Sequence, residues 1–234
     1  MGNSVPTALK DYLSNDQNDV DILSKRPTFD QINRLPKVVL HDHLDGGLRP
    51  SRISELAQQV NYELPTTDPE KLAIWFEESC SSGSLERYLK TFKHTVALMQ
   101  TRENIIRVAR ESVLDLARDN VVYAEIRNGP ELHLLGGLTL DEVIEATLEG
   151  YRLGTEDAKK EGYKIKAYAI LCALRQFQNH QIIAEKCIKY RDQGVIGFDI
   201  AGPEHGYPPA DHLATFNYLR EENFHFTIHA GEAF

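Results

Sequence analysis

Short apolar runs alternate with longer amphipathic stretches along most of the sequence. The runs, each of a length that suits one buried strand, lie at 38–40, 121–126, 165–172, 195–200 and 225–229. In the amphipathic stretches, apolar residues recur at every third or fourth position, which is the spacing of one helix face. These stretches lie at 70–78, 85–99, 101–119, 142–160, 178–190 and 211–222. Strands that alternate with helices predict right-handed crossovers and a mostly parallel sheet.

Capping residues mark where two of these helices should begin. Asp68 precedes a proline, so an N-cap acceptor stands before the residue best suited to the first helical position. Thr139 and Glu142 have the spacing of a capping box. The polar residues 1–34 have weak periodicity and predict an N-terminal arm with a short helix. Residues 35–234 are expected to form the main domain.

Composition narrows the class of partner. A formal net charge of −9 argues against nucleic acid or an anionic membrane, because both require concentrated Lys and Arg. No apolar run approaches the ~20 residues of a membrane span, and the N-terminus lacks the pattern of a secretory signal. The cysteines Cys80, Cys172 and Cys187 are widely spaced, which suits a reducing compartment. We therefore expect a cytoplasmic protein that binds a small molecule, with its oligomeric state left open.

Unusual polar residues gather where the predicted strands end. His41 and His43 follow the first run, and Glu125 and Arg127 end the second. Asp199 ends the fourth, Gly202 and Glu204 follow it, and the fifth ends at His229 with Glu232. Because the carboxyl ends of parallel strands share one edge, these side chains should meet there. Asp199 either shapes this edge or only ends its strand, and Glu125 with Arg127 is expected to form a structural pair beneath it.

Two histidines separated by one residue can bind one ion together. Side chains two positions apart on a strand point to the same face, so the imidazoles of His41 and His43 could both reach a metal. Taken alone this spacing is a weak signal, and the alternative is an ordinary pair of surface or core histidines. The signal becomes much stronger when His229-Ala230-Gly231-Glu232 ends another strand.

Three segments in this order resemble the adenosine deaminase family. They are Leu40-His41-Asp42-His43-Leu44-Asp45-Gly46, Gly197-Phe198-Asp199-Ile200-Ala201-Gly202 and Thr227-Ile228-His229-Ala230-Gly231-Glu232. The resemblance covers roughly residues 35–234. It implies an α/β fold, a TIM-type (β/α)8 barrel of which this chain would contain about the first five βα units. The nucleobase deaminases with a Pro-Cys-x-x-Cys motif are a separate class, and this chain lacks that motif.

The resemblance also implies an activity and a metal. The family hydrolyses adenosine and 2'-deoxyadenosine to inosine and ammonia in purine metabolism, with one Zn²⁺ per chain. By position, His41, His43 and His229 would be the metal ligands, and Glu232 would be the catalytic proton shuttle at N1 of the purine. A zinc ion lowers the pKa of the water bound to it to around 7. A carboxylic acid in a dry pocket can protonate the purine ring.

Further residues would contact the purine nucleoside. By resemblance, His43, Asp45 and Gly202 would bind the substrate, with Asp45 on a ribose hydroxyl and Gly202 leaving space for the ring. The alternative for Asp45 is a turn residue before two glycines. Trp75 and Phe76 fall where the family has an apolar lid, although packing in the core is an equal alternative.

The sequence stops where the family pattern continues. In the family, three more strands follow the segment that matches 227–232, and they bring a further histidine and an Asp-Asp pair of which one member binds zinc. We therefore expect this chain to be the N-terminal part of a deaminase, by truncation or as a fragment. The rival interpretations are a deaminase of adenine, an N6-substituted purine or AMP, and an inactive remnant. Asp45 disfavours AMP, because a carboxylate at the ribose end would repel a phosphate.

Overall fold

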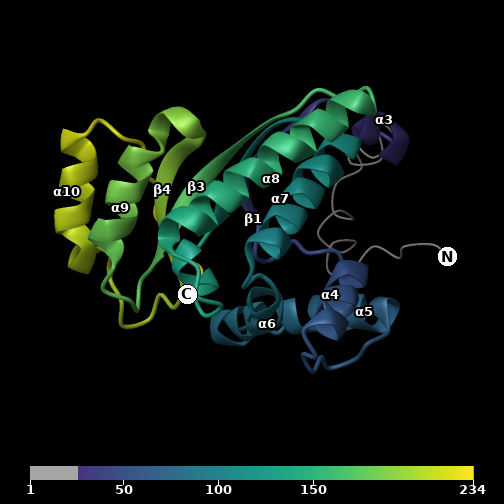
Figure 1. Cartoon of the computed structure of the whole chain (residues 1–234), viewed down its shortest axis with the longest axis horizontal. Helices are drawn as coiled ribbons and strands as arrows, with labels where there is room; N and C mark the ends of the chain where they lie inside the picture. Colours follow the sequence, from purple (N-terminus) through teal and green to yellow (C-terminus); the bar gives the residue numbers. More distant parts are fainter. Residues whose placement is uncertain (1–25, 234) are drawn as a thin grey trace, which may run out of the picture. The chain divides into compact units, whose positions relative to one another are not determined.

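The computed structural model in Figure 1 describes residues 26–233. The chain divides into two units, Met1–Leu35 and Pro36–Phe234. In the described part of the first unit, α3 (Phe29–Arg34) begins with a capping box. The predicted arm before residue 26 lies outside the described residues. Within the described range, no helix is both long enough and apolar enough to cross a membrane.

Four parallel strands form the sheet of the second unit, in the order β1-β2-β3-β4. They are β1 (Lys37–His43), β2 (Val121–Asn128), β3 (Lys166–Leu174) and β4 (Val195–Ala201). The apolar runs therefore predict the strands correctly, although each strand extends one to three residues past its run. β1 has a register irregularity between Val39 and Asp42, next to the first histidine. Such irregularities re-aim the side chains beside them.

The predicted strand at 225–229 is wrong as a full strand. This segment runs parallel to β4 but contributes one isolated bridge, Phe198 with Phe226. Its backbone bonds to β4 are His225 O to Phe198 N at 3.0 Å, Thr227 N to Phe198 O at 2.8 Å, and His229 N to Ile200 O at 3.2 Å. A strand needs successive ladder pairs, and these bonds involve only two residues of β4. They are enough to hold the segment beside the end of β4.

The helices of the second unit are α4 (Pro50–Gln59), α5 (Pro69–Cys80), α6 (Leu85–Leu98), α7 (Arg102–Arg118), α8 (Leu140–Lys160), α9 (His180–Lys189) and α10 (Leu213–Glu221). Short 3₁₀ turns lie at Pro130–His133, Arg191–Gln193 and Pro209–His212. Both predicted caps are present. Asp68 accepts the N–H of Glu70 at 3.0 Å, and Thr139 with Glu142 forms the capping box of α8. α4 is not among the predicted helices, and its N-cap position holds Arg49 without a side-chain cap bond.

Two long helices cover the sheet, and their close contact depends on glycine. α7 and α8 lie side by side in Figure 1. A Cβ on Gly150 of α8 would lie 2.4 Å from the Cβ of Ala109 and 2.7 Å from the carbonyl oxygen of Ile106 on α7. α4, α5 and α6, which lie between β1 and β2 in the sequence, pack together as a group, whereas α9 and α10 pack together beside β4.

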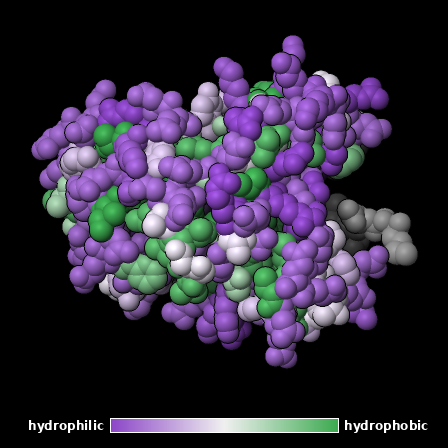
Figure 2. Space-filling model, in the orientation of Figure 1, coloured by the Kyte–Doolittle hydropathy of each residue, from purple (hydrophilic) through white to green (hydrophobic). Residues whose placement is uncertain are grey.

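The surface is mostly polar, apart from one edge of the sheet. Figure 2 shows a face dominated by hydrophilic side chains, with apolar ones in small groups. Among the described residues, β1 pairs only with β2. Two of its apolar side chains, Val38 and Leu40, are 59% and 54% exposed. This open edge matches the expectation of an incomplete barrel.

Candidate metal centre

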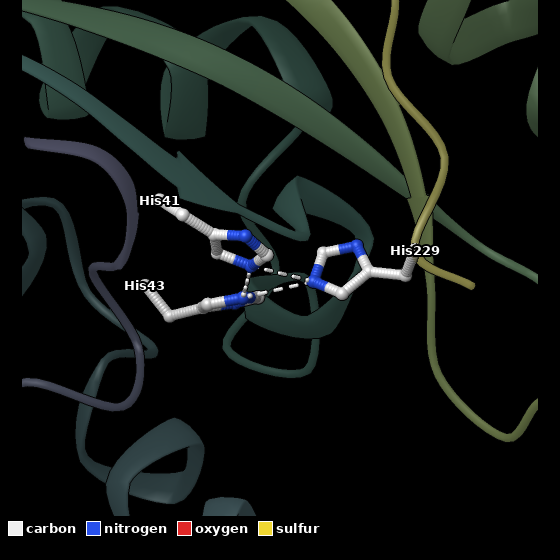
Figure 3. A group of neighbouring side chains, drawn as sticks. All are labelled: His41, His43 and His229. Carbon is white, nitrogen blue, oxygen red and sulfur yellow. Dashed lines mark hydrogen bonds between the residues drawn. The ribbon is translucent and has the colours of Figure 1, made fainter. Parts of the chain in front are cut away.

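Three imidazole rings from distant parts of the sequence meet at one edge of the sheet. The Nε2 atoms of His41 and His43 are 3.2 Å apart, and His229 Nε2 lies 2.9 Å from the first and 3.2 Å from the second. Figure 3 shows the rings pointing at a common centre, two from β1 and one from the segment after α10. The structure therefore brings together the histidines that the sequence singled out.

His229 is held in place by contacts to both its backbone and its ring. Its N–H donates to the carbonyl of Ile200 at 3.2 Å, and its carbonyl accepts from the guanidinium of Arg175. Its ring Nδ1 lies 2.8 Å from a carboxylate oxygen of Asp199. A proton on Nδ1 that is donated to Asp199 leaves the Nε2 lone pair free for the centre. This hydrogen bond fixes the tautomer that a metal-binding histidine needs.

A buried ion pair lies directly behind the histidines. Arg127 on β2 donates to Asp199 at 2.5 Å, and their side chains are 4% and 0% exposed. The same guanidinium donates to the carbonyl of Leu40 at 2.7 Å, next to His41. The expected pairing of Arg127 with Glu125 is wrong. Glu125 instead accepts the hydroxyl of Tyr123, two residues earlier on the same strand, at 2.8 Å, while Arg127 pairs with Asp199.

The surroundings of His41 and His43 favour the neutral form of their rings. Burial, and then the neighbouring rings of His229 and His41, lower the pKa of His43 to about 4. Burial and Arg127 lower the pKa of His41. Burial by itself would raise the pKa of Asp199, but the hydrogen bond from His229 and the nearby Arg127 hold it below its usual value. Neutral imidazole and ionised carboxylate are the forms that metal binding requires.

The arrangement of donor atoms fits a metal ion. Nitrogens that bind one zinc ion tetrahedrally at ~2.0–2.1 Å are ~3.3–3.4 Å apart, close to the observed 2.9–3.2 Å. His41, His43 and His229 form the group of possible ligands found among residues 26–233. Three lone pairs aimed at one point repel one another unless a cation or proton lies between them. A set of imidazoles suits zinc among the common protein metals.

A cavity of about 990 Å³ opens in front of the histidines. Its apolar wall comes from α6, including Tyr88, Leu89 and Phe92. Trp75 and Phe76, candidates for a lid, are not among the lining residues. Phe76 packs against the core, as the core-packing alternative predicts for it, and its ring centroid lies 5.0 Å from that of the partly buried Trp75.

The other residues expected at the site also line this cavity. They are Asp45, Gly202 and Glu232. Asp45 is 3% exposed; one of its oxygens accepts the N–H of Gly129 at 3.4 Å, and the other has no protein partner. Burial raises the pKa of Asp45 to about 6. Gly202 has φ of +98°, and a Cβ there would lie 2.7 Å from the amide oxygen of Gln176.

Three further polar residues shape the site, and two of them, Arg175 and Gln176, are not among the residues that the sequence predicts there. Arg175 and Gln176 directly follow β3, and Glu204 follows β4. Arg175 is buried and joins the carbonyl of His229 to that of Tyr207, the second at 2.7 Å. Arg175 and Gln176 follow the end of a strand, as Glu204 does, so their position at a strand end is the signal that could have identified them.

Comparison with known proteins agrees with the geometry. The adenosine deaminase family model matches residues 36–234. Adenosine deaminase 1 of Streptomyces coelicolor is 57% identical over 213 residues, which are 91% of this chain and 54% of that protein. The crystal structure of the Arabidopsis N6-mAMP deaminase has a TM-score of 0.73 and 28% identity, covering 87% of this chain and 61% of that one.

Another similar structure is the adenine deaminase of Arthrobacter aurescens, with a TM-score of 0.65 and 25% identity over 84% of this chain and 58% of that one. The chain thus spans little more than half the length of these relatives. Together with the parallel sheet, these neighbours confirm the predicted fold, the first part of a (β/α)8 barrel.

Proposed function

The chain belongs to the adenosine deaminase family, and on that premise we propose that the protein hydrolyses adenosine and 2'-deoxyadenosine to inosine and ammonia. One observation carries the proposal. Three imidazole nitrogens lie within 3.2 Å of one another in the wall of a cavity that also contains Glu232. Such a set of bases, with a carboxylic acid nearby, suits the hydrolysis of a bond at an electron-rich ring.

His41, His43 and His229 would hold a single zinc ion. When bound, zinc makes water ionise near neutral pH and so provides a strong nucleophile. Asp199 keeps the Nε2 lone pair of His229 directed at the ion through the hydrogen bond to Nδ1, which is 2.8 Å long. Arg127 keeps Asp199 ionised for this purpose, at 2.5 Å.

Glu232 would handle the proton at the purine ring. Attack at C6 becomes easier when N1 is protonated, because the ring then accepts the electron pair. Glu232 lines the cavity from the turn that follows His229. Its carboxyl group is the expected donor to N1 while the oxygen of water bonds to C6. Of the two protons of that water, one would return to Glu232 and the other would pass to the amino group, which leaves as ammonia when the C6–N bond breaks.

The substrate would lie between Gly202 and Asp45. Gly202 has no side chain in the space beside Gln176, so a flat ring can approach its backbone N–H. The unpartnered oxygen of Asp45 is a ready acceptor for a ribose hydroxyl. Unpaired buried acceptors are rare, and a ligand hydroxyl would relieve the cost. His43, on the cavity wall, would contact the same substrate.

A related purine is the second candidate substrate. Two solved structures that resemble this chain are named for N6-mAMP and adenine. The carboxylate of Asp45 argues against a nucleotide, since a 5'-phosphate near it would be repelled. Adenine has no ribose to use the free oxygen of Asp45, so the site supports a nucleoside best.

Metal analysis and a spectrophotometric adenosine assay on one preparation test the proposal. We expect one zinc per chain with turnover, and loss of both in His229→Ala. His225→Ala is the matched control, because this exposed histidine lies on the same segment. Turnover in metal-free protein, or unchanged zinc content in His229→Ala, would contradict the ligand assignment. Zinc without turnover on adenosine, adenine or N6-methyl-AMP would support the inactive-remnant interpretation.

A further inference from the structure

A second carboxylate, Glu204, accepts hydrogen bonds from the backbone of the turn that carries Glu232. Its Oε1 accepts the N–H of Gly231 at 2.7 Å, and its Oε2 accepts those of Glu232 and Ala233, each at 2.9 Å. Three successive backbone N–H groups therefore converge on one side chain. Gly231 has φ of +76°, a left-handed conformation that lets the chain curl around an anion.

The bonds to Glu204 are strong for a surface contact. Hydrogen bonds to an ionised acceptor are roughly twice as strong as those between neutral groups. The N–H groups of Ala233 and Gly231 are the main causes that lower the pKa of Glu204, which keeps it ionised at neutral pH. The backbone of this turn is otherwise exposed to water. Without Glu204, nothing else among the described contacts would fix those N–H groups.

Glu204 also connects the two halves of the proposed reaction site. It lies two residues after Gly202, the expected contact for the purine ring, and it holds the turn of Glu232, the expected proton donor. Arg175 forms a separate tie between the same two segments, through the carbonyls of Tyr207 and His229. Arg175 therefore holds the backbone of His229, whereas Glu204 holds the backbone of Glu232.

We propose that Glu204 is a positioning residue for deamination, which sets the direction of Glu232 toward N1 of a purine lying against Gly202. The proposal rests on the function proposed above. Its basis is the three hydrogen bonds that this one carboxylate accepts from the backbone N–H groups of residues 231–233. A proton donor displaced by about 1 Å can lose ~10²-fold in rate, so Glu204 should affect kcat more than substrate binding.

The first test is kinetic and uses the protein expressed from its complete gene. Glu204→Gln keeps one oxygen but places an NH₂ group against N–H donors, so kcat should fall ~10–100-fold. KM and zinc content should stay within about two-fold, because His229 is held by Ile200, Asp199 and Arg175 instead. Glu204→Asp, with both oxygens on a shorter arm, should regain part of the rate. Glu221→Gln on the exposed side of α10 is the control.

A double variant separates positioning from a general structural role. If Glu204 acts through Glu232, then Glu204→Gln combined with Glu232→Gln should be no slower than Glu232→Gln alone. Losses that multiply would overturn the proposal, and so would a Glu204→Gln protein with full kcat. A fall in zinc content equal to the fall in rate would also overturn it, since Glu204 would then be supporting the ligands.

A second measurement does not depend on turnover. Amide hydrogen exchange at Gly231, Glu232 and Ala233 should be at least ten-fold faster in Glu204→Gln than in the parent protein, with no change in the control. Unchanged exchange rates would show that Glu204 does not hold these three N–H groups. If the parent protein fails to deaminate adenosine, the proposed function fails, while this exchange experiment still decides whether Glu204 orders the turn.

Discussion

Replacing Asp199 by asparagine should damage both the fold and the metal centre. Asn has nearly the same shape but no charge, so Arg127 would remain charged in the core. Its remaining acceptors would be the carbonyl of Leu40 at 2.7 Å and the hydroxyl of Thr227 at 3.5 Å. Removing one partner of a buried ion pair costs ~3–5 kcal/mol. We therefore expect the free energy of unfolding of the metal-free protein to fall by about that amount.

The metal centre should weaken for a separate reason. Asp199 accepts the hydrogen bond from Nδ1 of His229 at 2.8 Å, and asparagine is a weaker acceptor that can also turn its NH₂ group toward the ring. Loss of such an outer partner typically lowers metal affinity ~10–100-fold. Urea unfolding without metal measures the first effect, and zinc competition against a chelator measures the second.

Asp119→Asn is the matched control for this experiment. Asp119 makes an ion pair with Lys37 at 3.2 Å, but its side chain is 58% exposed. Solvent-exposed pairs contribute only ~0–1 kcal/mol. If Asp199→Asn changes the unfolding free energy no more than this control does, the buried pair does not support the fold. If zinc affinity is also unchanged, Asp199 does not orient His229.

Three further outcomes follow from the same structure. Gly150→Ala should destabilise the protein by ~1–3 kcal/mol in urea unfolding, because its Cβ would lie 2.4 Å from that of Ala109. Gly202→Ala should lower kcat/KM for adenosine, and Gln176→Ala should restore it only in part, since φ of +98° remains strained. Burial lowers the pKa of His133 from 6.5 to about 4, so its contribution to stability is complete above pH ~6.5. As pH falls toward 4 this contribution, about 3 kcal/mol, should be lost in urea titrations, and His133→Asn should reduce the slope.

The sequence predicts most elements of the second unit, because local signals determine them. The N-caps Asp68 and Thr139 indicate where α5 and α8 begin. The missed helix α4 has Arg49 at its N-cap position and no side-chain cap, so its start lacks that signal. The sequence predicts a strand at 225–229 because this short run has the length of one buried strand. Pattern alone cannot tell how many ladder bonds a neighbouring strand will offer.

The candidate ligands could be predicted because strand ends share an edge, but their supporting contacts could not. Arg127 and Asp199 lie on β2 and β4, which are separated by β3 in the sheet. Their contact depends on the register of two intervening pairings, and nothing in the spacing along the sequence encodes it. Glu125 lies two residues from Arg127 and on the same face of β2, so the sequence predicts it as the partner, yet its carboxylate accepts the hydroxyl of Tyr123 instead.

Arg127 explains why three mutually repelling lone pairs can remain together. One nitrogen of its guanidinium donates to Leu40 O, next to His41, and another donates to Asp199, which holds His229. Its own carbonyl accepts the N–H of Leu44 at 2.8 Å, just past the second histidine of β1. One buried residue thus fixes the backbone on one side of the centre and the ring on the other. The ligands are therefore positioned by contacts outside the centre, so binding a cation requires little further ordering of the chain.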